Sequence, residues 1–275
     1  MTTPAARLRP VDDRGDAERA ALARLYDIDL AEDPGDLELY VALARRTGGP
    51  IVELAAGTGR LAVPLAAAGY DVVGVDRDPE MLARARAAAG RAGGAVPGRL
   101  ELIEADLLDW RPPGGPRFRL AILALNSILL LGTRTAQRAA VRAMAELLAP
   151  GGLAVVDAWQ PDADDLGRFD GRLVLEYVRR DEATGRDVTK TAAAWHDATR
   201  AAVTLTAIWD EAAPGEAPIR WTRTDRLRLV TADELGGFAE DAGLVVETIA
   251  GDYGLGPIGP GSDRAILVAV RPGGA

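Results

Sequence analysis

Between residues 50 and 160 the chain alternates short β-like runs with helical runs, and this alternation constrains the fold more than any other feature. The β-like runs are PIVELAA, YDVVGVD, RLELIEAD, RFRLAILAL and LAVVDAW. Helical segments separate them, except for one Pro/Gly loop before RFRLAILAL. Strands alternating with helices build a parallel sheet covered by crossover helices. The sequence therefore predicts an α/β fold with an open, doubly wound, mainly parallel sheet.

The segments around this core change in period. Residues 16–29 and 36–48 have apolar residues at helical spacing, and we expect two helices there that cover one edge of the sheet. Residues 171–230 alternate in steps of two between turn-like segments, which is typical of an antiparallel meander. A helix follows, with Thr231 as N-cap and Glu234 completing a capping box. Two more strands, within 244–251 and 264–271, complete a seven-stranded, Rossmann-like sheet.

We therefore expect three parts of the chain. Residues 1–49 form an N-terminal helical cap, and residues 50–160 and 230–275 form the ligand-binding core. Residues 161–229 form an antiparallel β lid inserted before the last strands, on the side of the substrate.

Composition excludes several classes of function. The net charge is −9, from 32 basic and 41 acidic residues, and no dense Lys/Arg run is present, so we expect no nucleic-acid partner. The absence of cysteine excludes disulfides, thiolate metal sites and cysteine nucleophiles, and we expect no metal. The first twenty residues lack an apolar signal core, and no apolar run reaches eighteen residues. We therefore expect neither export nor a membrane span, and a cytoplasmic protein.

A glycine-rich turn follows the first strand of the core. The strand ends in Gly57-Thr58-Gly59 and passes directly into a helix, which brings main chain close to any ligand above the sheet. The pattern Gly-x-Gly-x-x-Ala also satisfies the relaxed dinucleotide fingerprint, and both interpretations require an acid such as Asp76 at the end of the second strand. The glycine spacing alone leaves both ligands open.

Glu53, just before the turn, distinguishes between them. Its carboxylate would repel a phosphate and attract an ammonium or sulfonium, so we expect a cationic small molecule. Asp76 can accept hydrogen bonds from ribose hydroxyls, and Asp106, after the third strand, from an exocyclic amine. Each acid has a simpler interpretation when it is considered alone. Glu53 can pair with an arginine such as Arg60, and the two aspartates can cap the helices that follow them. Three acids at three adjacent strand ends favour a ligand site.

The motifs VELAAGTGRLAVPLA, VVGVDRDPEMLARAR and IEADLLDW resemble those of the class I S-adenosylmethionine-dependent methyltransferases. The resemblance is strongest over residues 50–160 and extends loosely over 20–272, where YDID and the meander look like the small-molecule branch with a β lid. It implies that S-adenosylmethionine is the cofactor. The implied cofactor-binding residues are Glu53, Ala55, Gly57 and Gly59 at the amino-acid part, Asp76 and Arg77 at the ribose, Asp106 and Leu107 at the adenine, and Asn126.

Ala55 departs from the family pattern, which usually has a glycine at this position. Because alanine disfavours positive φ, we expect the turn to keep Ala55 in an ordinary backbone conformation.

Candidate residues on the acceptor side are less well defined. Asn126 and Ser127 follow the fourth strand, where substrate-facing groups or a turn cap are equally expected. Tyr26 and Tyr253 are candidates to contact the methyl group or the acceptor, although packing is the simpler role for both. Methyl transfer needs chiefly alignment of the reactants, exclusion of water and a deprotonated nucleophile.

His196 is the only histidine and hence the natural base for a hydroxyl acceptor, although its place beside a hairpin turn is typical of an exposed residue. The candidate catalytic residues are therefore His196, Tyr26 and Asn126. Four of the five tryptophans lie in or just before the meander and suggest an aromatic acceptor pocket, or packing of the lid on the core: Trp159, Trp195, Trp209 and Trp221.

The sequence thus predicts an S-adenosylmethionine-dependent methyltransferase that acts on N or O of a small molecule, as a monomer or homodimer. A NAD(P)-dependent oxidoreductase is one alternative, favoured by Gly-x-Gly-x-x-Ala and disfavoured by Glu53. A protein that binds S-adenosylmethionine without methylating is the other, since its cofactor site would have the same residues.

Overall fold

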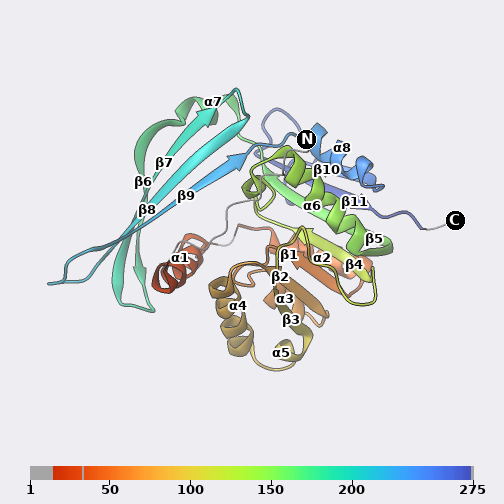
Figure 1. Cartoon of the computed structure of the whole chain (residues 1–275), viewed down its shortest axis with the longest axis horizontal. Helices are drawn as coiled ribbons and strands as arrows, with labels where there is room; N and C mark the ends of the chain where they lie inside the picture. The colour runs from red at the N-terminus through yellow and green to blue at the C-terminus, as the bar shows by residue number, and fades with distance from the viewer. Residues whose placement is uncertain (1–14, 33, 274–275) are drawn as a thin grey trace, which may run out of the picture.

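A computed structural model describes residues 15–32 and 34–273 of the chain. Residues 1–14, where the sequence predicts no export signal, lie outside the described part. The described chain forms one seven-stranded sheet with helices on both faces, sheet A, and one four-stranded antiparallel sheet, sheet B (Figure 1).

Sheet A has the strand order β10-β11-β5-β4-β1-β2-β3. Its strands are β1 (Ile51–Leu54), β2 (Val72–Asp76), β3 (Leu100–Glu104), β4 (Phe118–Leu123), β5 (Leu148–Trp159), β10 (Val245–Ala250) and β11 (Arg264–Val270). Strands β1 to β5 are parallel, and β11 pairs antiparallel with both β5 and β10. The predicted mainly parallel seven-stranded sheet is confirmed. Because β1 lies between β4 and β2, the strand order reverses at β1, where doubly wound sheets bind their ligands.

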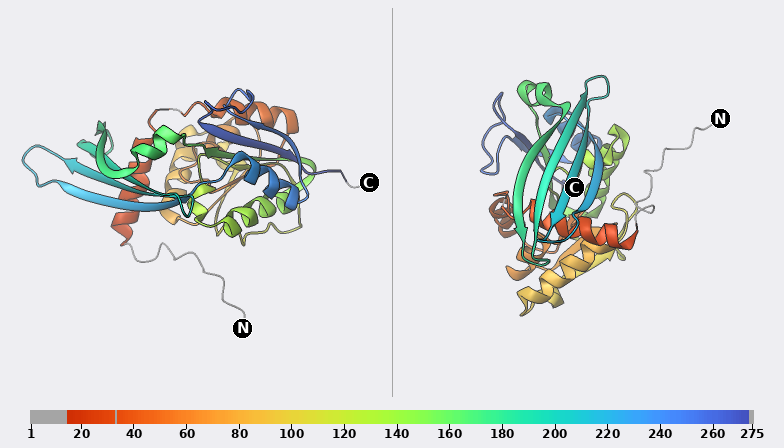
Figure 2. Two further views of the ribbon diagram at one scale, coloured as in Figure 1. Left: turned by 90° about the horizontal axis from the view of Figure 1, so that it is seen from above. Right: turned by 90° about the vertical axis from the view of Figure 1, so that its left-hand side faces the viewer.

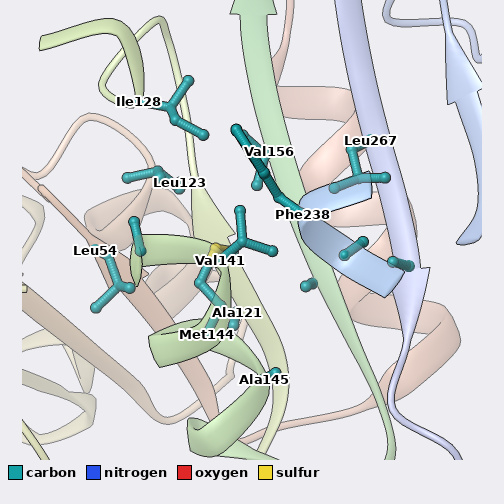
Figure 3. Close-up of a cluster of buried hydrophobic side chains, with 14 of the residues drawn as sticks. Leu54, Ala121, Leu123, Ile128, Val141, Met144, Ala145, Val156, Phe238 and Leu267 are labelled. Carbon is teal, nitrogen blue, oxygen red and sulfur yellow. The ribbon is translucent and has the colours of Figure 1, made fainter. Parts of the chain in front are cut away.

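Alternate residues of the central strands face two separate cores. In β4, Leu120 and Ile122 pack with the helices α2 (Leu37–Thr47) and α3 (Ala62–Ala67). Ala121 and Leu123 face the other core, which contains α6 (Arg134–Leu147) and Phe238 of α8 (Ala232–Asp241) (Figure 3). Burial on both faces explains why these strands are continuous apolar runs in the sequence.

Local signals set the helix ends. Asp78 caps α4 (Pro79–Ala92), with Pro79 at its first position, and Thr231 and Glu234 form a capping box at α8. The capping box at α8 agrees with the sequence prediction. The short helices α5 (Val96–Arg99), η1 (Leu129–Leu131) and α7 (Ala163–Arg168) lie in loops that the sequence leaves unassigned.

Sheet B is the predicted meander, in the order β6-β7-β8-β9. Its strands are β6 (Asp170–Asp181), β7 (Arg186–Asp197), β8 (Ala202–Ala212) and β9 (Ile219–Arg228). The assignment of cap, core and lid domains to fixed boundaries stays a prediction.

The two N-terminal helices do not cover a sheet edge as predicted. Helix α2 packs on the central strands, and α1 (Asp16–Asp29) lies between sheet B and α4 (Figure 1). Leu22 and Leu25 of α1 form a buried cluster with Val188, Ala207 and Trp209 of sheet B. The apolar stripe of α1 predicts that the helix is buried but not which element covers it. In the structure, sheet B covers it.

Candidate cofactor site

The glycine turn begins where β1 ends. Gly57 has a φ of 54° and Gly59 a φ of 80°, which only glycine adopts without strain. A Cβ on Gly59 would lie 3.1 Å from the Cβ of Ala85 in α4, so this glycine also permits close packing of the turn. A Cβ on Gly57 would lie 3.9 Å from Cε1 of Tyr26, and α1 thus places its tyrosine against the turn.

Ala55 contradicts the sequence-based expectation, because its φ is 56° and lies in the left-handed region. The next residues explain why this conformation persists. The Ala56 amide donates to Val75 O at 3.0 Å, and the Gly57 amide donates to the Asp76 carboxylate at 2.8 Å. These hydrogen bonds hold residue 55 in the left-handed conformation that glycine adopts readily. Alanine adopts the same conformation at a cost in backbone strain.

Glu53 is a buried carboxylate aimed at this turn. Its side chain is 4% exposed, and Oε2 has no hydrogen-bond partner. Burial raises the pKa of Glu53 to about 8, although the nearby Arg60 charge and a backbone hydrogen bond at Ala62 lower it. An unpartnered buried oxygen is costly unless a ligand satisfies it, and an ammonium group supplies both a donor and a positive charge. The residues present thus fit the amino-acid part of S-adenosylmethionine.

Arg60 does not serve Glu53 as a salt-bridge partner. Its guanidinium binds both carboxylate oxygens of Asp36, at 2.5 and 2.7 Å, and Asp36 is fully buried. The sequence does not predict this pair, because the two residues lie 24 positions apart and no local pattern links them.

Asp76 ends β2 beside the turn. One carboxylate oxygen accepts from the Gly57 amide and the other from the Asp78 amide, at 2.8 and 2.9 Å. Burial raises the pKa of Asp76, and the same two hydrogen bonds oppose that shift. Arg77, the next residue, is exposed. Asp76 therefore positions the turn, and its contact with a ribose stays a prediction.

Asp106 follows β3. Glu53, Asp76 and Asp106 therefore lie toward the carboxyl ends of three adjacent parallel strands, β1, β2 and β3. Its Oδ1 accepts from the Leu108 amide at 2.9 Å, the local turn contact that the simpler interpretation expects. Leu107 is half-buried beside it. One hydrogen bond leaves the second carboxylate oxygen of Asp106 available, and its role toward adenine stays a prediction.

Tyr26 lies at the centre of the charges around the turn. Burial raises the pKa of its hydroxyl to about 12, and the charges of Arg60, Glu53, Arg223 and Asp76 also act on it. Arg223 belongs to β9 and shares its sheet face with Trp209, the face that packs on α1. Sheet B thus brings Arg223 near the glycine turn together with Asp225, its ion-pair partner at 2.8 Å, and no local pattern in the sequence predicts this.

Asn126 is held by the ends of two other strands. It has a φ of 66°, and its Oδ1 accepts from the Trp159 amide at 2.7 Å and from Arg264 at 3.2 Å. Arg264 also donates to the buried Asp157, at 2.6 Å, and Tyr253 donates its hydroxyl to Asp157 at 3.2 Å. The Asn126 oxygen and the Tyr253 hydroxyl are therefore engaged within the protein, and their roles toward ligands stay predictions.

Ser127 lies in the turn after Asn126, and its amide donates to Ala124 O at 3.1 Å. His196 lies at the end of β7, and its backbone amide donates to Phe169 O at 3.1 Å. It lies beside the hairpin turn as predicted, but it is half-buried and not exposed, which differs from the expectation. Its role as a base stays a prediction.

The tryptophans do not line a common pocket. Trp209 donates its indole N–H to Asp29 of α1, and Trp221 donates to Glu211 of the neighbouring strand. Both tryptophans belong to the apolar cluster between sheet B and α1. Trp195 lies on the opposite face of sheet B, because it is an odd number of residues from Lys190, which pairs with Trp209. The interpretation of these tryptophans as one aromatic pocket is therefore wrong.

Two kinds of feature are absent from the described residues. No helix within 15–32 and 34–273 is long and apolar enough to cross a membrane. In the same ranges, no three His, Cys, Asp or Glu side chains are grouped so that they can hold a metal ion.

The strand order, the turn after β1 and the buried Glu53 together define a class I methyltransferase core. Residues 51–152 match the family described as "Methyltransferase domain", and this span holds Glu53, the glycine turn, Asp76 and Asp106. Residues 51–152 are therefore a methyltransferase domain, and the residues of its candidate site fit S-adenosylmethionine as the cofactor. This confirms the resemblance found in the sequence.

Two curated relatives differ in how much of the chain they match. The chain is 28% identical over 249 residues to a dTDP-3-amino-3,4,6-trideoxy-alpha-D-glucopyranose N,N-dimethyltransferase of Streptomyces venezuelae. The matched segment covers 87% of this chain and 94% of that protein. It is 38% identical over 111 residues to ribosomal RNA small subunit methyltransferase J of Alkalilimnicola ehrlichii, which covers 39% of this chain. The chain spans only 42% of the length of the second relative.

Among solved structures, a sugar N-methyltransferase from Streptoalloteichus matches 99% of both chains, with a TM-score of 0.71 and 23% identity. This likeness shows that the whole fold is shared, including sheet B.

Proposed function

We propose that this enzyme transfers the methyl group of S-adenosylmethionine to the amino nitrogen of a small molecule, and that the acceptor is an amino sugar carried on a nucleotide. The similarity to the Streptomyces venezuelae enzyme supports this acceptor, because it extends over 94% of that protein. The RNA methyltransferase is similar over a much shorter segment, and a net charge of −9 disfavours an RNA acceptor.

Nitrogen is favoured over oxygen because the Streptomyces venezuelae relative is an N,N-dimethyltransferase, and this is the single observation that carries the choice. The state of Tyr26 is consistent with it. With a pKa of about 12, its hydroxyl stays protonated at neutral pH and can only donate or accept a hydrogen bond there. A hydroxyl acceptor needs a general base, whereas an amine in its free-base form already carries a nucleophilic lone pair. Bound S-adenosylmethionine supplies an electrophilic methyl group on a sulfonium.

The residues at the mouth then bind and orient the reactants. We assign Glu53, Gly57 and Gly59 to the amino-acid part of the cofactor, Asp76 to the ribose and Asp106 to the adenine. The free oxygen of Glu53 and the fixed turn support the first assignment. Sheet B, within residues 161–229, covers the acceptor and excludes water.

The test is incubation of the purified enzyme with S-adenosylmethionine and a dTDP-linked 3-amino sugar, followed by mass spectrometry. The matched control is the same sugar with a hydroxyl in place of the amine. We expect mass gains of one or two methyl groups on the amino sugar only. Methylation of the hydroxy sugar alone would refute the choice of nitrogen. Binding of the cofactor without methylation of either sugar would refute the sugar acceptor and favour a different substrate.

A further inference from the structure

Gln137 is a fully buried polar side chain on α6, whereas the other buried residues of that helix are all apolar. Its Nε2 donates to Ile128 O at 3.2 Å and to Arg228 O at 2.8 Å. Its Oε1 accepts from Nη1 of Arg228 at 2.7 Å. A buried amide is costly unless its polar atoms are bonded, and both ends of this one are engaged. These bonds therefore explain why a glutamine occupies an inward position of α6.

The two carbonyl groups that Gln137 binds belong to distant segments. Ile128 lies in the loop after β4 (residues 124–132), and Arg228 is the last residue of β9, where sheet B returns to the core. Strand β9 and η1 of this loop are neighbours here (Figure 1). Figure 2 (left) shows sheet B extending outward from sheet A, so its position depends on how its connections to the core are held. Among the described residues, no other side chain bonds to both segments.

Local hydrogen bonds connect Ile128 to the predicted acceptor-side residues Asn126 and Ser127. The Leu129 amide donates to Asn126 O at 2.8 Å, which closes the turn that contains Ile128. A displacement of Ile128 is therefore passed on to Asn126 and Ser127. The contact with Gln137 thus fixes one side of the acceptor site, while the contact with Arg228 fixes the end of the sheet that covers it.

Arg228 is held from the other side by α8. Its guanidinium donates to both carboxylate oxygens of Glu234, at 2.7 and 3.2 Å, and Glu234 is part of the capping box of α8. This ion pair joins the end of β9 to the core, but it does not reach the loop after β4. Only the bonds of Gln137 relate the two segments to each other.

We propose that Gln137 is a positioning residue for methyl transfer, which holds the loop after β4 and the end of β9 at a fixed separation on either side of the acceptor. The inference rests on the proposed function, in which sheet B covers the acceptor. Gln137 acts through Ile128 and Arg228 and not by contact with the reactants. Loss of its bonds weakens binding of the acceptor, whereas the cofactor site at the ends of β1, β2 and β3 keeps its own contacts.

Two substitutions on the same face of α6 test this role. Gln137→Met keeps the length of the side chain and removes its hydrogen bonds, and Val141→Ala removes buried methyl groups one turn further along. We expect urea to unfold both variants at lower concentrations than wild type. With the dTDP-linked 3-amino sugar, we expect kcat/KM to fall at least about tenfold in Gln137→Met, chiefly through KM. The affinity for S-adenosylhomocysteine changes less than about threefold.

Val141→Ala is the control for a loss of stability alone, and we expect its KM for the sugar to equal that of wild type. An equal rise of KM in both variants would overturn the proposal, because destabilisation would then be the cause. An unchanged KM in Gln137→Met would also overturn it.

Hydrogen exchange tests the role of Gln137 without an acceptor. We expect the amides of residues 124–132 and 224–228 to exchange at least about tenfold faster in Gln137→Met than in wild type, and less than about threefold faster in Val141→Ala. Faster exchange in only one of the two segments, or in neither, would overturn the proposal. If the wild-type enzyme methylates no amino sugar, the proposed function fails, and the exchange rates then decide the role of Gln137.

Discussion

The backbone amide of Gly57 donates a 2.8 Å hydrogen bond to the carboxylate of Asp76, and this contact ties the turn after β1 to the end of β2. The other oxygen of Asp76 holds the Asp78 amide at the start of α4. The Asp76 side chain therefore holds both the turn after β1 and the start of α4 in position beside the cofactor site.

Replacement of Asp76 by Ala removes both contacts. Hydrogen bonds to a charged group contribute about 1.5–3 kcal/mol each, so we expect the affinity for S-adenosylhomocysteine to fall at least about tenfold. Calorimetric titration measures this directly. Asp71→Ala is the control, because the Asp71 side chain is exposed and lies at the opposite end of β2. Unchanged binding by the Asp76→Ala variant would remove Asp76 from the site.

The raised pKa of Glu53, about 8, makes cofactor binding depend on pH. The ammonium group of the cofactor favours the ionised carboxylate, so binding below about pH 8 must release a proton. We expect the affinity for S-adenosylhomocysteine to rise by up to about tenfold per pH unit between about pH 6 and 8. Calorimetry in two buffers of different ionisation enthalpy counts the released proton. In Glu53→Gln we expect no proton release and a flat profile, and a sloping profile there would assign the effect to another group.

The same group affects the stability of the protein without cofactor. Because the folded pKa lies above the unfolded value near 4.5, Glu53 favours folding most below that value. This contribution is lost as the pH rises through about 8. We expect the thermal stability of the wild-type protein to decrease between about pH 4.5 and 8, and that of Glu53→Gln to decrease less.

Ala55→Gly is expected to stabilise the protein. The left-handed conformation costs a non-glycine residue about 1–2 kcal/mol, and the greater freedom of glycine in the unfolded chain offsets part of the gain. We expect a net increase of about 0.5–1 kcal/mol in the free energy of unfolding by urea, with cofactor binding unchanged. Ala56→Gly is the control, because Ala56 is buried with an ordinary φ and its loss of packing should destabilise. A destabilised Ala55→Gly variant would show that the methyl group of Ala55 makes a needed contact.

Arg24 of α1 joins the lid to the rest of the protein through ion pairs with Asp181 and Glu211. Both carboxylates are nearly buried, with 5 and 3% of their side chains exposed. Arg24→Ala leaves them without this charge, and we expect a loss of about 3–5 kcal/mol in the free energy of unfolding. Tryptophan fluorescence in urea reports it, because Trp209 and Trp221 lie in the same contact region.

The control is Arg220→Ala, whose ion pair with Asp210 is exposed and should contribute less than about 1 kcal/mol. Equal losses in the two variants would contradict the importance of the buried pair.

The sequence by itself determines much of this protein because many of its signals are local. Alternating β and helical runs, the cap at Asp78 and the capping box at Thr231 depend on neighbouring residues, and the strands and helices form where those residues predict. The order of acids at three strand ends is also local, since parallel strands place their carboxyl ends at one edge. Glu53, Asp76 and Asp106 therefore fall together at the edge that the sequence predicts.

Only the tertiary structure decided the remaining features, because they depend on contacts between distant segments. The turn around Ala55 takes a left-handed conformation since hydrogen bonds from Ala56 and Gly57 to β2 hold it there. Helix α1 lies under the lid because Arg24 meets two acids more than 150 residues away. Trp195 faces outward and Trp209 inward because strand register, which no local pattern fixes, sets the face of each side chain.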